Sequence, residues 1–415
     1  MHHVIIGAGP AGVIAAETLR RKSQVDSITI IGNEPYPAYS RMAIPYFLAG
    51  DVAEEGTYLR HAENHFSDLE IDIRNESVTA VAPADKSVSL SNGESVRYDR
   101  LLLATGASAI RPPISGMDSP RVHNCWTLSD AHKLLHDVNA GDRVVLLGAG
   151  FIGCIVLQAL VEMKLDLTVI ELADRMLARM MDDPGGRMIK TWCESKGVKV
   201  RTGAEAIAVE EKDGALEITL GDGTSIAADH IVCAAGVRSN TDFLAGSGIN
   251  TDHGILVDNH LQTNIEGIYA AGDVAQGPDL STGEQQVHAI QPTASEHGRI
   301  AGSQMAGEAV PYGGSLSMNV LNTLGLITSS FGLWHGVDGG ERVASEDQAY
   351  NRYLRLEFKD DVLIGALAIG LTQHVGILRG LVQTGVRLGA WKQRLMTDPS
   401  QIMHAYLACV QGSRA

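Results

Sequence analysis

Two glycine-rich turns of the same form, far apart in the chain, most constrain what this sequence can fold into. They are Gly7-Ala8-Gly9-Pro10-Ala11-Gly12 and Gly148-Ala149-Gly150-Phe151-Ile152-Gly153, and each follows an apolar β-like run and opens a helix-like run. In a strand–turn–helix unit, such glycines permit a tight turn, let the backbone approach a pyrophosphate, and let the helix pack closely on the strand. Two turns of this kind predict a protein that holds two dinucleotides.

Acidic residues follow both turns near the place where a dinucleotide site needs them. A carboxylate roughly 20 residues after the glycines receives ribose hydroxyls. Glu171 follows the strand expected over 168–170, and Asn33 and Glu34 follow the strand expected over 28–31. Because the first acid comes slightly late, Asn33 is able to share the role of Glu34.

The two turns head two copies of a longer pattern. The copies end in a β-like run and a glycine, over 98–106 and 228–236, and both contain stretches with the period-two alternation of a β-meander. Each copy therefore predicts one α/β domain, whose final glycine lies at the carboxyl edge of the sheet, where ligands bind. A third run, over 265–270, leads into Ala271-Gly272-Asp273, and an aspartate there is able to bond a sugar-alcohol chain.

The order of these motifs resembles that of the two-dinucleotide-domain flavoproteins. That family includes rubredoxin and ferredoxin reductases, the flavin part of NADH-dependent nitrite reductase, and apoptosis-inducing factor. The resemblance implies an α/β fold with two Rossmann-like domains, the second inserted into the first, followed by a C-terminal α+β module. The implied divisions are an FAD-binding domain over 1–112 and 241–310, an NAD(P)H-binding domain over 113–240, and the module over 311–415.

The resemblance also implies which residues hold the two cofactors. Those expected to hold FAD are Gly7, Gly9, Pro10, Ala11, Gly12, Asn33, Glu34, Arg41, Val78, Ala104, Thr105, Gly106, Gly272, Asp273, Pro292 and Thr293. Those expected to hold NAD(P)H are Gly148, Gly150, Phe151, Ile152, Gly153, Glu171 and Gly236. NADH is favoured over NADPH because the Glu171 carboxylate repels a 2′-phosphate, although Arg175 and Arg179 keep NADPH as the alternative.

The chain departs from its relatives between the two cofactors. Some relatives carry a redox cysteine within the segment 39–46, and others pair a lysine near Tyr46 with a glutamate at the position of Ile155; this chain has none of these groups. We therefore expect no redox disulfide and an apolar face beside the nicotinamide, with Tyr46 as the candidate catalytic side chain. Hydride transfer itself requires no protein acid or base, because the cofactors carry that chemistry.

The composition and charge of the chain limit which partners, location and metal sites are expected. The net charge of −16 argues against nucleic acid, whose binding needs basic surface. No apolar run approaches the roughly 20 residues that span a bilayer, and no signal peptide is apparent, so we expect a cytoplasmic protein. The five cysteines are widely spaced, which predicts buried apolar side chains and no metal site.

The last hundred residues carry a different pattern. The stretch 353–369 alternates around the turn Lys359-Asp360-Asp361 and predicts a β-hairpin, and 374–396 has apolar residues at helical spacing. In relatives such a module covers the flavin or forms a dimer interface, so a homodimer is one expectation.

These observations predict an FAD-dependent oxidoreductase that takes hydride from NAD(P)H to flavin N5. The electrons then go to a separate acceptor, either an iron–sulfur protein or a partner redox subunit. The alternatives are an NADH oxidase or reductase of a small oxidant, and a redox-sensing flavoprotein that holds FAD and NAD.

Overall fold

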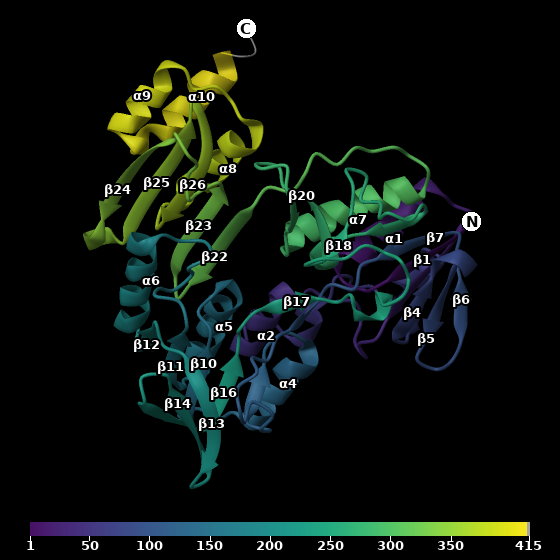
Figure 1. Cartoon of the computed structure of the whole chain (residues 1–415), viewed down its shortest axis with the longest axis horizontal. Coiled ribbons are helices and arrows are strands. Elements are labelled where there is room, and N and C mark those ends of the chain that lie inside the picture. Colours follow the sequence, from purple (N-terminus) through teal and green to yellow (C-terminus); the bar gives the residue numbers. More distant parts are fainter. Residues whose placement is uncertain (413–415) are drawn as a thin grey trace. The chain divides into compact units, whose positions relative to one another are not determined.

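The computed structural model describes residues 1–412, with side chains as far as Cys409. The chain forms two compact units, each built from two separate segments (Figure 1). Unit 1 consists of Met1–Ala109 and Val237–Ser315, and unit 2 consists of Ile110–Gly236 and the chain from Leu316 onwards. Each unit is described by itself.

Unit 1 contains a parallel sheet with the strand order β19-β7-β1-β2-β3. The strands are β1 (His2–Ile6), β2 (Ser27–Gly32), β3 (Ile71–Asn75), β7 (Arg100–Leu103) and β19 (Ile268–Ala270). The central residues of β1, β2 and β7 are branched and fully buried, as expected for strands covered on both faces, whereas Ile73 of the edge strand β3 is 44% exposed. Strand β19 follows the second copy of the repeat and pairs with β7 of the first, so the chain returns to its first sheet.

Helices α1 (Pro10–Lys22) and α7 (Gln291–Met305) pack against each other beside this sheet. Their backbones approach closely because α7 carries glycines at the contact. A Cβ on Gly298 would lie 2.3 Å from the Ala11 carbonyl oxygen, and one on Gly302 would lie 2.7 Å from that of Ala15. The remaining elements of unit 1 are α2 (Ile44–Ala49), α3 (His65–Asp68), the meander β4 (Val78–Ala82), β5 (Ser87–Leu90) and β6 (Ser95–Arg97), the ribbon β8 (Ala107–Ala109) and β17 (Val237–Ser239), and β18 (Ile255–Leu256), β20 (Ala275–Pro278) and β21 (Gln285–Val287).

Unit 2 repeats the arrangement with a parallel sheet in the order β12-β11-β10-β16-β9. Its strands are β9 (Val122–Asn124), β10 (Arg143–Leu147), β11 (Asp166–Glu171), β12 (Lys199–Thr202) and β16 (His230–Cys233). Its helices are α4 (Leu128–Asp137), α5 (Phe151–Glu162) and α6 (Asp183–Ser195), and its meander is β13 (Ala206–Lys212), β14 (Ala215–Leu220) and β15 (Ser225–Ala228). The internal repeat and the meanders predicted from the sequence are both present.

The C-terminal part of unit 2 is an antiparallel sheet, β22-β23-β26-β25-β24, followed by helices. The strands are β22 (Met318–Thr323), β23 (Leu326–Gly332), β24 (Glu341–Asp347), β25 (Arg352–Lys359) and β26 (Val362–Ile369), and the helices are α8 (Val375–Thr384), α9 (Ala390–Thr397) and α10 (Ile402–Gly412). The predicted hairpin is confirmed as β25 and β26. The stretch 374–396 with apolar residues at helical spacing forms two helices, α8 and α9, because Gly385 adopts a left-handed φ of +60° and ends α8.

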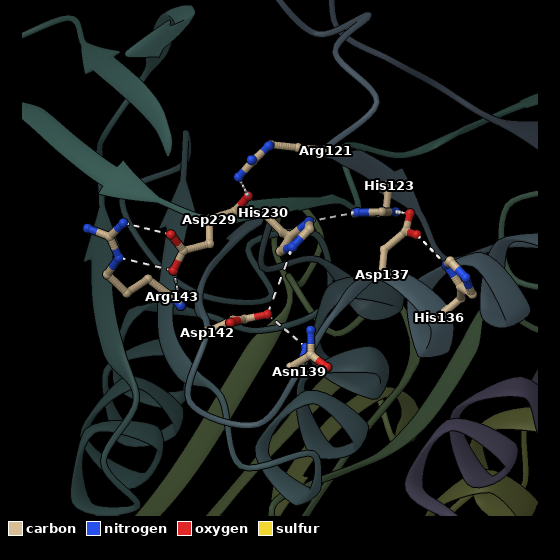
Figure 2. Close-up of polar contacts among 9 residues, drawn as sticks. All are labelled: Arg121, His123, His136, Asp137, Asn139, Asp142, Arg143, Asp229 and His230. Carbon is tan, nitrogen blue, oxygen red and sulfur yellow. Dashed lines mark hydrogen bonds and ion pairs between the residues drawn. The ribbon is translucent and has the colours of Figure 1, made fainter. Parts of the chain in front are cut away.

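A buried histidine, His123, and a partly buried one, His230, join β9 and β16 near the ends where these strands begin. The ring nitrogens of His123 and His230 lie 3.0 Å apart, and each ring has an aspartate 3.9 Å from its other side, Asp137 beside His123 and Asp142 beside His230 (Figure 2). Burial lowers the pKa of His123 to about 4, and the neighbouring His230 adds to the effect. His123 is therefore neutral near pH 7. The pair lies at the sheet edge opposite the glycine turn, because strands β9 and β16 run parallel to β10.

We expect His123 to make unit 2 less stable in mild acid. The unfolded chain binds a proton near pH 6.5 and the folded chain only near pH 4, so stability falls as the pH is lowered through this window, by about 1.4 kcal/mol per pH unit. His123→Gln should flatten this dependence, whereas His136→Gln, at a side chain 87% exposed, should leave it unchanged. All four tryptophans lie in unit 2, so their fluorescence reports the unfolding of this unit. Urea unfolding followed in this way at pH 6.5, 5.5 and 4.5 measures how the stability of unit 2 depends on pH. Equal slopes in both variants would contradict the assignment.

Candidate nucleotide-binding sites

The first glycine turn has one packed glycine at each end and an open one between them. A Cβ on Gly7 would lie 2.1 Å from the Ala104 carbonyl oxygen, and one on Gly12 would lie 2.0 Å from that of Gly7. A Cβ on Gly9 would meet no described atom within 4 Å. Gly9 is the N-cap of α1, and no side chain of the described residues caps this helix. The open space and the free N–H groups suit a phosphate at the helix N-terminus.

The second turn repeats this geometry in unit 2. A Cβ on Gly148 would lie 2.5 Å from the Ala234 carbonyl oxygen, and one on Gly153 would lie 2.1 Å from that of Gly148. Gly150 is open in the same way as Gly9, and it begins α5, for which the described chain provides no side-chain cap. Phe151 and Ile152 form the first turn of α5. Both turns therefore place an uncapped helix N-terminus at the carboxyl edge of a parallel sheet, a geometry that suits an anion.

The two predicted ribose acids have different surroundings. Glu171 ends β11, and its carboxylate accepts the N–H of Ala149 at 2.5 Å and that of Ala173 at 2.7 Å. These bonds hold the carboxylate beside the glycine turn. Glu34 instead accepts from Arg41 at 2.9 Å and from the hydroxyl of Tyr39, and Asn33 is exposed.

Asp273 follows β19 at the carboxyl edge of the sheet of unit 1. Burial raises the pKa of its carboxyl, and the positive charge of Arg41 opposes this shift. The ring of His297 accepts the N–H of Gly272 at 3.3 Å, and its other nitrogen lies 2.8 Å from the Tyr312 hydroxyl. Burial lowers the pKa of His297 to about 4, so the neutral ring accepts from Gly272 and holds the backbone beside Asp273.

The remaining predicted residues lie on segments around these edges. Ala104, Thr105 and Gly106 follow β7, and Pro292 and Thr293 begin α7, whose N-terminus is not capped by any described side chain. Val78 begins β4, Gly236 follows β16, and Tyr46 lies on α2 with 55% of its surface exposed.

Sequence reasoning missed two residues of unit 1 that hold the backbone at Asp273 and at Thr105. Ser239 donates to the Asp273 carbonyl oxygen at 3.1 Å, and the Asn240 side chain donates to the Thr105 carbonyl oxygen at 2.9 Å. Both residues directly follow the second copy of the repeat. The sequence carries no local signal for these contacts, because they join segments more than 30 residues apart.

The cysteines of the described residues are widely spaced in the sequence. All five cysteines fall within the described residues, none of them is in a disulfide, and four of them are buried, as the sequence predicts. Burial raises the pKa of the Cys154 thiol well above its usual value, which keeps it protonated. Within residues 1–412 no group of three potential ligands is arranged to hold a metal ion, and no helix is long and apolar enough to cross a membrane.

Comparison with known proteins decides the family. The family model described as pyridine nucleotide-disulphide oxidoreductase matches residues 1–297, which is more than half of the chain. The chain belongs to this family. It is therefore an oxidoreductase that uses a flavin and a pyridine nucleotide, as the motifs predict, and its two parallel sheets confirm the predicted α/β class.

Individual relatives cover nearly the whole chain. The NADH-dependent phenylglyoxylate dehydrogenase subunit epsilon of Aromatoleum evansii is 31% identical over 401 residues, which are 96% of this chain and 95% of that protein. The 3-phenylpropionate/cinnamic acid dioxygenase ferredoxin–NAD(+) reductase component of Photorhabdus laumondii is 28% identical and covers 91% of this chain and 95% of its own. The covalent putidaredoxin reductase–putidaredoxin complex has a TM-score of 0.89 over 98% of this chain and 99% of that chain at 24% identity, which supports the fold alone.

The two kinds of glycine should respond differently to a methyl group. Gly150→Ala has room in the folded chain, so unit 2 should remain folded while NAD⁺ binds about tenfold more weakly, because the methyl group occupies the approach of the pyrophosphate. Gly153→Ala forces a clash with the Gly148 carbonyl and should lower the urea midpoint of unit 2 markedly. Calorimetric titration with NAD⁺ and urea unfolding check the pair; equal loss of stability in both variants would contradict the open site at Gly150.

Proposed function

We propose that this chain holds FAD in unit 1 and NADH in unit 2, and that it exchanges electrons with a separate acceptor protein. The supporting observation is the pair of equivalent cradles, each an uncapped helix N-terminus behind a glycine that has open space around it. When bound, FAD accepts hydride from the nicotinamide, so the protein needs to supply only position and charge.

The residues of unit 1 suit FAD. Gly7, Gly9 and Gly12 shape the pyrophosphate cradle, and Asp273 offers a carboxylate to the ribitol hydroxyls. Arg41 also faces this region, since its charge acts on both Glu34 and Asp273. The uncapped start of α7, at Gln291 to Thr293, directs a partial positive charge that stabilises negative charge on a reduced flavin. This arrangement favours tight retention of the cofactor.

The surroundings of Glu171 favour NADH. Its carboxylate is fixed beside the glycine turn and repels a 2′-phosphate. Arg175, one of the two arginines that could attract that phosphate, is engaged by Asp174 at 2.7 Å and Asp183 at 2.9 Å. Its Nε also donates to the Met181 carbonyl oxygen. Arg179 is exposed and is the remaining candidate for NADPH.

Removing the Glu171 carboxylate should weaken the preference for NADH. Glu171→Ala loses the ribose acceptor and the repulsion of a phosphate together, so the ratio of the NADPH to the NADH dissociation constant should fall about tenfold or more. Asp166→Asn, at the start of the same strand and paired only with Lys199 at the surface, is the matched control and should leave the ratio unchanged. If the ratio of dissociation constants is unchanged in Glu171→Ala, the Glu171 carboxylate does not determine the preference for NADH.

A separate acceptor agrees with the named relatives. One relative is a subunit of a dehydrogenase and the other is a reductase component that acts between ferredoxin and NAD⁺. The five cysteines are scattered and none is in a disulfide, so the described residues offer no internal dithiol relay to carry the electrons onward. The acceptor proposed is accordingly an iron–sulfur protein or an iron–sulfur subunit of a complex that also contains this chain.

Rapid mixing of the FAD-loaded protein with NADH tests this function. The flavin absorbance should bleach within seconds, should recover slowly in air, and should recover rapidly when an oxidised ferredoxin is added. Failure of NADH to bleach the flavin would contradict electron transfer and favour a binding or sensing role. Recovery in air as fast as recovery with ferredoxin would instead support an NADH oxidase.

A further inference from the structure

Strand β25 buries a polar face. Leu354, Leu356 and Phe358 enter the apolar core of the C-terminal sheet, and the alternate residues Tyr353, Arg355 and Glu357 point the other way. Alternation of this kind usually leaves the polar face in water. Here Tyr353 is only 3% exposed, Arg355 9% and Glu357 3%.

The group that meets this face is Asp182, the N-cap of α6. Its carboxylate accepts from the N–H of Gly185 at 3.1 Å, from the Tyr353 hydroxyl at 2.5 Å and from Arg355 at 2.8 Å. Arg355 is held in turn by Glu357, which accepts from its Nε at 2.6 Å. Burying such a network requires free energy to remove water from the charged groups. It also fixes their geometry, because each charged group has a defined partner.

Asp182 also ends the loop that begins directly after Glu171. This segment, residues 172–182, is called the ribose loop below. Inside it, Leu177 donates its N–H to the carbonyl oxygen of Ala149, the residue between the first two glycines of the turn, at 2.9 Å. The N–H of Ala149 bonds the Glu171 carboxylate. The ribose loop thus connects the glycine turn at one end with Asp182 and the C-terminal sheet at the other.

We infer that Arg355 is a positioning residue for the pyridine nucleotide, an inference that rests on the proposed NADH site of unit 2. Arg355 fixes Asp182, Asp182 fixes the end of the ribose loop, and the loop holds Ala149 and Glu171 where the nucleotide meets them. An unanchored loop samples more conformations, and ordering it upon binding reduces affinity. The C-terminal sheet therefore contributes to nucleotide affinity through a residue that does not touch the nucleotide.

Helix α6 offers a matched control at its other end. The Trp192 indole N–H donates to the carbonyl oxygens of Thr323 and Leu324, both at 3.1 Å, in the turn between β22 and β23. This contact joins the same helix to the same C-terminal sheet, but it has no bond to the ribose loop. Trp192→Phe removes this donor and retains most of the packing.

The test compares Asp182→Ser, Arg355→Met, Arg355→Lys and Trp192→Phe in the FAD-loaded full chain. Serine keeps the N-cap acceptor and loses the carboxylate, so Asp182→Ser breaks the link with little harm to α6. We expect Asp182→Ser and Arg355→Met to raise the NAD⁺ dissociation constant about fivefold or more, as measured by calorimetry. They should also speed hydrogen exchange of the ribose-loop amides. Arg355→Lys should recover part of the affinity, and Trp192→Phe should change neither quantity.

Other results would overturn the inference. If Asp182→Ser and Arg355→Met lower the unfolding midpoint but leave NAD⁺ binding and loop exchange as in the unmodified chain, the contact is only structural. Equal effects of Trp192→Phe on affinity would also contradict a specific link. If the unmodified chain itself does not bind NAD⁺, the proposed function fails, and hydrogen exchange still decides whether Arg355 anchors the ribose loop.

Discussion

The contact of backbone with backbone at the carboxyl edge of each parallel sheet supports both proposed sites. In unit 1, Gly7 lies against the Ala104 carbonyl, and in unit 2, Gly148 lies against the Ala234 carbonyl. Both contacts are too close to leave room for a side chain on the glycine. Because these glycines let the turn lie flat on the neighbouring strand, the following helix begins directly at the sheet edge. Its free N–H groups then face the position of a phosphate.

The surroundings make the two cradles unequal. In unit 1, Glu34 is bound by Arg41 and Tyr39, and Asp273 lies in a buried place whose backbone is held by the neutral ring of His297. In unit 2, the Glu171 carboxylate accepts two backbone N–H groups, from Ala149 and Ala173. The charged side chains around the first turn and the backbone N–H groups around the second agree with the proposal of FAD in unit 1 and NADH in unit 2.

Much of the fold could be predicted from the sequence because the informative patterns are local. The two glycine turns, the meanders and the hairpin of β25 and β26 are each specified by residues within a few positions of one another. The helical spacing over 374–396 is also matched, by α8 and α9, although Gly385 ends α8 and divides the stretch. Contacts that join distant segments, such as Ser239 with Asp273, left no such pattern.

The sequence by itself determined that two strand–turn–helix units with open glycines exist, because only glycine permits the required backbone conformation and the close approach. It also determined that no dithiol pair lies near the first turn. Only the tertiary structure decided which charges meet: that Arg175 is engaged by Asp174 and Asp183, and that Arg355 reaches Asp182 from a strand some 170 residues away. Such partners depend on how whole helices and strands pack. The residues next to a side chain in the sequence do not specify which distant element will pack against it.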